Sequence, residues 1–266
     1  MQLGISTYTL TWSFGVPGYE KPMNDYTLHD LIAAARERGL TLIQIGDNVP
    51  LQHWSDAELA ELKLAADDAG VTIELGTRGT ETALLRKYLE LAVRLDSSLV
   101  RTLITAPHLE EAERDLQAIA AEYETHGVRL AIENHGLHTT AQLVQLFSSL
   151  NSPVIACCLD TVNSFGALEG PEQVIHALMP YTVNLHIKDF DIQRVDHMMG
   201  FTVLGTPAGA GRLHIPELLQ QLRATGREAT AILELWTPYT RSVEETIQLE
   251  QQWMEQSLDY LKELMT

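Results

Sequence analysis

The 266-residue sequence predicts an α/β fold, a (β/α)8 TIM barrel that forms a single domain over residues 1–266, and three observations support this. Short runs of apolar and β-branched residues alternate with longer segments of helical period. Eight such pairs follow one another along the chain. Glycines stand just after several helical segments, and the chain length is typical of α/β barrels with one large core.

Each predicted strand is a short run dominated by apolar or β-branched residues. In chain order, the predicted strands are residues 2–8, 41–46, 71–76, 99–105, 129–134, 154–161, 182–188 and 230–236. A doubly wound open sheet is the alternative to a barrel. Such a sheet usually carries a glycine-rich phosphate turn after its first strand, and TYTLTWSFG is not one.

The predicted helices lie between and after these strands. In chain order, they are residues 27–38, 55–69, 81–95, 110–126, 140–150, 171–178, 215–225 and 242–264. Gly39, Gly70, Gly127 and Gly226 each follow a helical pattern, where a left-handed residue can end the helix. Eight strand–helix units with right-handed crossovers close into a barrel.

One long irregular segment interrupts this alternation. Residues 190–212 follow the seventh strand and contain several glycines, so we interpret them as a lid or substrate loop. The sequence GTPAGAG within this segment could bind an anion through backbone N–H groups, or it could simply provide flexibility.

Composition excludes several classes of partner. Lys and Arg number 18 against 36 Asp and Glu, and the net charge of −18 repels nucleic acid and anionic membranes. The adjacent Cys157 and Cys158 should point to opposite faces of a strand, which predicts core thiols without a disulfide. The chain has no basic leader and no apolar stretch long enough for a membrane span, so we expect a cytoplasmic protein.

Four acidic or imidazole residues end the fifth to eighth predicted strands: Glu133, Asp160, His186 and Glu234. The carboxyl ends of barrel strands meet at one rim, so these side chains should converge. Singly, each could be a core histidine or an acid paired with a residue such as Lys188. Together they would repel unless a cation or cationic residues gathered them. An oxygen-rich metal site suits Mn²⁺ first, with Mg²⁺ or Co²⁺ as alternatives.

These strand ends resemble those of the xylose-isomerase-like TIM barrel superfamily of sugar phosphate isomerases and epimerases, which includes ketose 3-epimerases and hydroxypyruvate isomerase. The motifs IENHG, CLDTVN, LHIKDF, GTPAGAG and ILELW carry the resemblance, which spans essentially the whole chain. It implies that Glu133, Asp160, His186 and Glu234 bind one divalent cation. It also implies that Glu133 and Glu234 are catalytic residues that move protons.

The chain departs from the ketose 3-epimerases at two substrate-binding positions. Asn163 stands where those enzymes usually have a histidine, and Ile192 stands where they have an arginine, although Arg194 is nearby. Asparagine can bind a hydroxyl group, but it cannot titrate. The departures therefore indicate a different substrate or a different proton route.

Further residues are candidates for contact with the substrate. Lys188 lies two residues after His186 on the same strand face, so it could bind an oxyanion or carry a proton, or it could form a structural ion pair. We predict substrate contacts for Asn163, His135, Glu74, Trp12, His108 and Arg194. For Glu74 the alternative is a salt bridge with Arg78 or Arg101.

The leading functional hypothesis is a metal-dependent isomerase or epimerase of a sugar, keto-sugar or related polyol, acting through an enediolate. The alternative is a metal-dependent lyase on the same site, either a sugar or polyol dehydratase or an eliminase of 3-oxo-glycosides. A non-catalytic sugar-binding barrel is a third reading. In each case the partner is a small carbohydrate. The last helix has an apolar stripe that includes Trp253, Leu258 and Leu261; it could serve a homo-oligomer, but packing on the barrel is the favoured interpretation.

Overall fold

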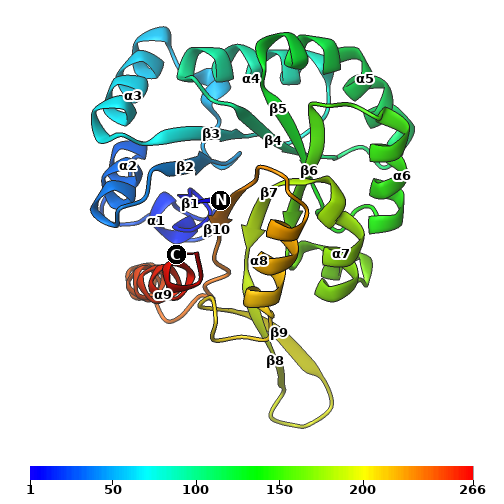
Figure 1. Ribbon diagram of the computed structural model, residues 1–266. Coiled ribbons are helices and arrows are strands. Elements are labelled where there is room, and N and C mark those ends of the chain that lie inside the picture. The colour runs from blue at the N-terminus through cyan, green and yellow to red at the C-terminus, as the bar shows by residue number, and fades with distance from the viewer. Residues whose placement is uncertain (266) are drawn as a thin grey trace.

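The computed structural model describes residues 1–265, and its eight parallel strands close into the predicted barrel (Figure 1). Around the barrel the strand order is β1-β10-β7-β6-β5-β4-β3-β2. The barrel strands are β1 Gln2–Ser6, β2 Leu42–Ile45, β3 Thr72–Gly76, β4 Leu99–Leu103, β5 Arg129–Glu133, β6 Ile155–Asp160, β7 Thr182–Ile187 and β10 Thr230–Leu233. All neighbouring pairs are parallel, so the carboxyl ends of the strands form one rim.

Helices surround this barrel, as Figure 1 shows. The long helices are α2 Leu28–Glu37, α3 Asp56–Ala69, α4 Thr82–Leu95, α5 Leu109–His126, α6 Thr140–Leu150, α7 Pro171–Leu178, α8 Ile215–Ala224 and α9 Val243–Met265. Short helical turns are α1 Thr11–Phe14, η1 Leu51–His53, η2 Asn163–Ala167 and η3 Met179–Tyr181. Within the described chain, no helix is both long enough and apolar enough to span a membrane.

Local sequence signals set many of the helix ends. Capping boxes begin α2, α3 and α6. In each, the side chain of Thr27, Ser55 or Thr139 accepts the backbone N–H of the residue three positions later, and the side chain of that later residue accepts the backbone N–H of the capping residue. The four glycines expected to end helices, at positions 39, 70, 127 and 226, all have φ of 66° or 67°. Asp96 and Asn151 end α4 and α6 in the same left-handed conformation without a glycine.

The core lies between the barrel and its helices and continues into the barrel interior. Cys157 and Cys158 are buried free thiols within β6, as the sequence predicted. Leu258 and Leu261 of α9 are also buried in the core, so the apolar stripe of this helix packs on the barrel.

Residues 190–212 do not form the irregular lid that we expected. They contain most of an antiparallel hairpin, β8 Asp189–Arg194 and β9 Phe201–Thr206, which projects from the barrel in Figure 1. The glycine-rich loop that follows wraps around the buried Asp189, whose carboxylate accepts the N–H groups of Gly209, Gly211 and Leu213. The loop therefore directs these N–H groups to a side chain of the protein, and not to a ligand.

Glu250 connects α9 to the short helix α1 at the rim. Its carboxylate accepts the N–H of Trp12 at 2.9 Å, the N–H of Ser13 at 3.1 Å and the Ser13 hydroxyl at 3.0 Å. Burial raises the pKa of Glu250 to about 7. This contact fixes α1, which carries Trp12 toward the carboxyl rim.

We predict that Glu250→Ala lowers the free energy of unfolding by roughly 2–4 kcal/mol, because three buried donors lose their acceptor. The pKa of Glu250 is about 7 in the folded chain against an ordinary 4.5, so the folded state holds a proton that the unfolded state releases. Its contribution is complete below about pH 4.5 and decreases as the pH rises through 7.

Urea unfolding at pH 5 and pH 8 measures this effect. The difference between the wild type and Glu250→Ala should be larger at pH 5. Glu255→Ala on the same helix is the control, because it removes only an exposed ion pair with Arg38 and should cost less than about 1 kcal/mol. Equal differences at both pH values would show that Glu250 does not titrate as described.

Candidate metal centre and active site

Four predicted ligand residues meet at the carboxyl rim of the barrel. The Nδ1 atom of His186 lies 3.7 Å from a Glu133 oxygen, 4.0 Å from an Asp160 oxygen and 3.4 Å from a Glu234 oxygen. All four side chains are buried. They belong to β5, β6, β7 and the end of β10, so the strand order of the barrel brings them together.

A polar layer below this cluster sets the proton position on His186. The side-chain N–H groups of Gln44 donate to Glu74 at 3.0 Å and to Asn184 at 3.1 Å, so the Gln44 oxygen faces His186. His186 Nε2 lies 2.7 Å from that oxygen and must carry the proton that it donates. The Nδ1 lone pair is therefore directed at the carboxylates, and Nδ1 has no hydrogen-bond partner among residues 1–265.

This arrangement fits a divalent cation. The ligand atoms of Asp160, His186 and Glu234 lie within 4.8 Å of one another in a buried group. A lone pair that faces three carboxylates is repulsive unless a cation lies between them, and oxygen ligands with one imidazole suit hard divalent ions. Cys158 lies near Glu133 and His186, but burial raises the pKa of its thiol well above its ordinary value, which leaves it a weak ligand.

Two cationic side chains share the carboxylates of this cluster. Lys188 Nζ lies 2.8 Å from both Asp160 and Glu234. Arg101 pairs with Glu133 and, at 3.0 Å, with Asp47. Burial opposes the charge of Lys188, but Asp160 and Glu234 raise its pKa above its ordinary value.

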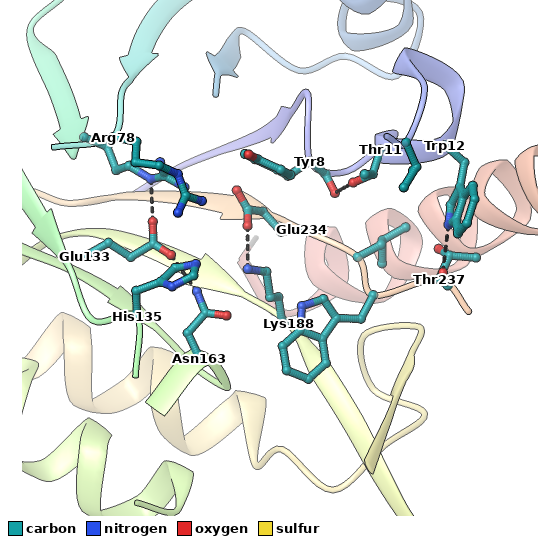
Figure 2. Close-up of a pocket in the computed structure, with 14 residues that line it drawn as sticks. Tyr8, Thr11, Trp12, Arg78, Glu133, His135, Asn163, Lys188, Glu234 and Thr237 are labelled. Atoms are coloured by element: carbon teal, nitrogen blue, oxygen red, sulfur yellow. Dashed lines mark hydrogen bonds and ion pairs between the residues drawn. The ribbon is translucent and has the colours of Figure 1, made fainter. Parts of the chain in front are cut away.

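A cavity of about 430 Å³ opens above the cluster (Figure 2). It is lined by Tyr8, Thr11, Trp12, Val16, Arg78, Arg101, Glu133, His135, Asn163, Lys188, Glu234, Leu235, Trp236 and Thr237. Glu133, Glu234 and Lys188, predicted to be catalytic, therefore face this space. So do Trp12, His135 and Asn163 among the predicted substrate-binding residues.

Asn163 also orients the cluster. Its side-chain amide donates to Glu133 at 2.6 Å, and its backbone N–H donates to Asp160 at 2.8 Å. It lies in η2, directly after the strand that supplies Asp160. The residue that replaces the expected histidine is thus held by two of the acidic residues.

Three predicted substrate contacts are corrected by the structure. Glu74 lies below the cavity, bonded to Gln44, Asn184 and Thr230, because it precedes the end of β3 by two residues. His108 lies at the start of α5 in a separate surface hollow. Arg194 belongs to the projecting hairpin, where it stacks on Phe201 at 4.5 Å.

Sequence reasoning gave no functional role to several cavity residues, chiefly Arg78 and Arg101. Arg101 stands inside the apolar strand β4, and a charged residue within such a run was a usable signal. Arg78 follows β3 by two residues in a loop, and its spacing gave no comparable signal.

Comparison with known proteins identifies relatives of the whole chain. The family model described as "Xylose isomerase-like TIM barrel" matches residues 32–264. A protein named 3-oxo-isoapionate decarboxylase, from Pectobacterium atrosepticum, is 36% identical over an alignment of 267 positions, which covers 98% of this chain and 95% of the relative.

Solved structures share the fold at low sequence identity. A D-psicose 3-epimerase with D-tagatose, from Clostridium cellulolyticum H10, matches with a TM-score of 0.71 and 17% identity over 98% of this chain and 97% of that chain. A xylose isomerase-like TIM barrel protein from Mycobacterium smegmatis, in complex with magnesium, matches with a TM-score of 0.70 and 14% identity over 97% of each chain.

The hydrogen bond from His186 to Gln44 makes a prediction about metal affinity. Gln44→Met removes the acceptor that holds the Nε2 proton, so the affinity for Mn²⁺ should fall ~10–100-fold. Titration calorimetry measures the change. Thr230→Val is the matched control, because it alters the same buried layer through Glu74 and Asn184 without touching His186. If both variants bind Mn²⁺ like the wild type, Gln44 has no part in orienting the ligand.

Proposed function

The family model covers most of the chain, so the protein belongs to the xylose isomerase-like TIM barrel family, and we propose that it is a divalent-metal-dependent decarboxylase of a 3-oxo sugar acid. The relative named 3-oxo-isoapionate decarboxylase, similar over 98% of the chain, supports the lyase alternative better than isomerisation or epimerisation. The proposed leaving group is carbon dioxide, in place of the water or aglycone that the lyase alternative specified.

The charge around the cavity is the observation that carries this proposal. Within residues 1–265, the charged side chains that line the cavity, or pair with one that does, are the cations Arg78, Arg101 and Lys188 and the carboxylates Asp47, Glu133, Asp160 and Glu234. The carboxylates exceed the cations by one, so a divalent ion would change the net charge from −1 to +1. A substrate with one carboxylate would neutralise that charge, whereas a neutral sugar would leave it uncompensated.

Decarboxylation of a 3-oxo acid requires few groups. The bond between C1 and C2 breaks, its electron pair moves toward the 3-oxo oxygen, carbon dioxide leaves, and a proton is delivered to C2. A divalent cation, when bound, would withdraw charge from the 3-oxo oxygen and a neighbouring hydroxyl group. Glu133, Asp160, His186 and Glu234 would hold that ion, Mn²⁺ first, with Mg²⁺ or Co²⁺ as alternatives.

Lys188 is the proton donor in this proposal. Its ammonium group lines the cavity and is held at 2.8 Å by both Asp160 and Glu234, which fixes its position. It gives one proton to C2 and recovers one from water, so no oxidant or reductant is consumed. The reaction needs no base, and Glu133 and Glu234 therefore act as ligands and not as the proton carriers expected for isomerisation.

Asn163 fits this reaction better than it fits epimerisation. The ketose 3-epimerases usually have a substrate-binding histidine at this position, whereas the side-chain amide of Asn163 donates to Glu133 at 2.6 Å and cannot titrate. The aromatic side chains of Trp12 and Trp236 line the cavity as well, and they offer an apolar wall to the departing carbon dioxide.

We expect the Mn²⁺-loaded protein to release carbon dioxide from a 3-oxo sugar acid in D₂O and to leave one deuterium on the carbon that was C2 of the acid. Mass spectrometry of the product and a carbon dioxide assay measure both outcomes. D-tagatose and D-fructose, as neutral ketoses, should remain unchanged. Deuterated isomers of the starting sugar, formed without carbon dioxide, would instead support isomerisation.

Lys188→Met should lower kcat for carbon dioxide release by ~10²–10⁴-fold, because the donor of the C2 proton is lost. Its affinity for Mn²⁺ should stay equal or increase, because Asp160 and Glu234 lose a competing cation. Lys63→Met is the control, since Lys63 pairs with Asp67 on the surface of α3. A kcat close to that of the wild type in Lys188→Met would rule out the donor role.

A further inference from the structure

We propose that Arg78, held in place by Asp47, binds the carboxylate of the substrate and thereby selects sugar acids over neutral sugars. This role rests on the proposed function, because it names the group that recognises the acid.

The other cations of the cavity are already paired. Lys188 and Arg101 are buried, and each contacts two carboxylates. The side chain of Arg78 is 49% exposed and donates only its Nε group, to Asp47 at 2.9 Å. Within the described chain its two terminal amino groups make no hydrogen bond, and Figure 2 places Arg78 on the same side of the cavity as Glu133 and His135.

Asp47 holds Arg78 without neutralising it fully. One Asp47 oxygen accepts Tyr8 Oη at 3.1 Å and Arg101 at 3.0 Å, and the other accepts Arg78. Partial burial opposes the ionisation of Asp47, but Arg101 and Arg78 lower its pKa to about 2. A single negative charge is thus shared by two guanidinium groups, so Arg78 keeps positive charge for a ligand.

The same contacts fix the position of Arg78 relative to the candidate metal cluster. Arg101 bridges Asp47 and Glu133, so Arg78 is linked to a predicted metal ligand through two side chains. A guanidinium anchored through Nε presents its terminal N–H groups as a planar fork that matches a carboxylate. The carboxylate of the substrate would therefore be held in a fixed plane, while the other oxygens of the substrate face the cluster.

This location predicts a particular kinetic effect. The substrate carboxylate loses its charge as it becomes carbon dioxide, so Arg78 stabilises the bound substrate more than the transition state. Loss of Arg78 should therefore raise KM for the 3-oxo acid ~10²-fold and leave kcat equal or higher. An arginine with only a structural role would not separate KM from kcat in this way.

Binding of two inert ligands to the Mn²⁺-loaded protein tests the inference independently of catalysis. D-threonate and D-threitol have the same number of carbons and differ in one terminal group, a carboxylate or a hydroxymethyl. Calorimetry should show that the wild type prefers threonate, that Arg78→Met loses this preference, and that Arg78→Lys keeps part of it.

Arg86→Met is the matched control. Arg86 is 48% exposed and also donates its Nε to a carboxylate at 2.9 Å, that of Glu122, but it lies on α4 away from the cavity. It should keep the ligand preference and the KM of the wild type. Circular dichroism checks the fold of each variant, and Arg78→Lys serves as the test if Arg78→Met does not fold.

The outcomes distinguish this inference from the proposed function. An unchanged preference for threonate in Arg78→Met, with active decarboxylation, would overturn the role of Arg78 and leave the decarboxylase proposal standing. An Arg78-dependent preference in a protein that releases no carbon dioxide would support acid binding and refute the proposed reaction.

Discussion

The rest of the site depends on an excess of negative charge at one end of a closed barrel. The unpaired Nδ1 of His186 is surrounded by Glu133, Asp160 and Glu234. Two buried cations, Lys188 and Arg101, pair with these carboxylates, but Arg101 also pairs with Asp47, so four negative charges face two positive ones. Buried like charges repel strongly at low dielectric constant, so this arrangement persists only with compensation. A divalent ion would supply it. With that ion bound and Arg78 counted, the net charge around the cavity would be +1, which favours an acidic substrate.

The protein supports this centre from below and from one side. Gln44, Glu74 and Asn184 form a buried polar layer that fixes the ring of His186, which is how outer partners commonly orient a metal-binding histidine. On the side, Asp47 and Arg101 connect the cluster to the wall of the cavity. The candidate site thus has a base formed by side chains of the barrel strands and walls formed by the loops that follow those strands.

The sequence was sufficient to predict the barrel and the convergence of four acidic or imidazole residues, because strand ends in a parallel barrel meet at one rim. It did not reveal the roles of Arg78 and Asp47, since their contacts join separate loops and depend on side-chain direction. Glu74 was placed one layer too high because it precedes the end of β3 by two residues. The hairpin of β8 and β9 was missed because glycines at positions 200, 205, 209 and 211 led us to interpret the whole segment as irregular, although only Gly205 lies within a strand.

Anomalous X-ray diffraction from crystals soaked in Mn²⁺ locates the cation that the cluster is proposed to bind. We expect one strong anomalous peak within coordination distance of His186 Nδ1 and of oxygens from Glu133, Asp160 and Glu234. His186 Nε2 should remain within hydrogen-bond distance of the Gln44 oxygen. A fully soaked crystal without a peak at this position, or with Nδ1 hydrogen-bonded to a protein donor, would refute the proposed metal site.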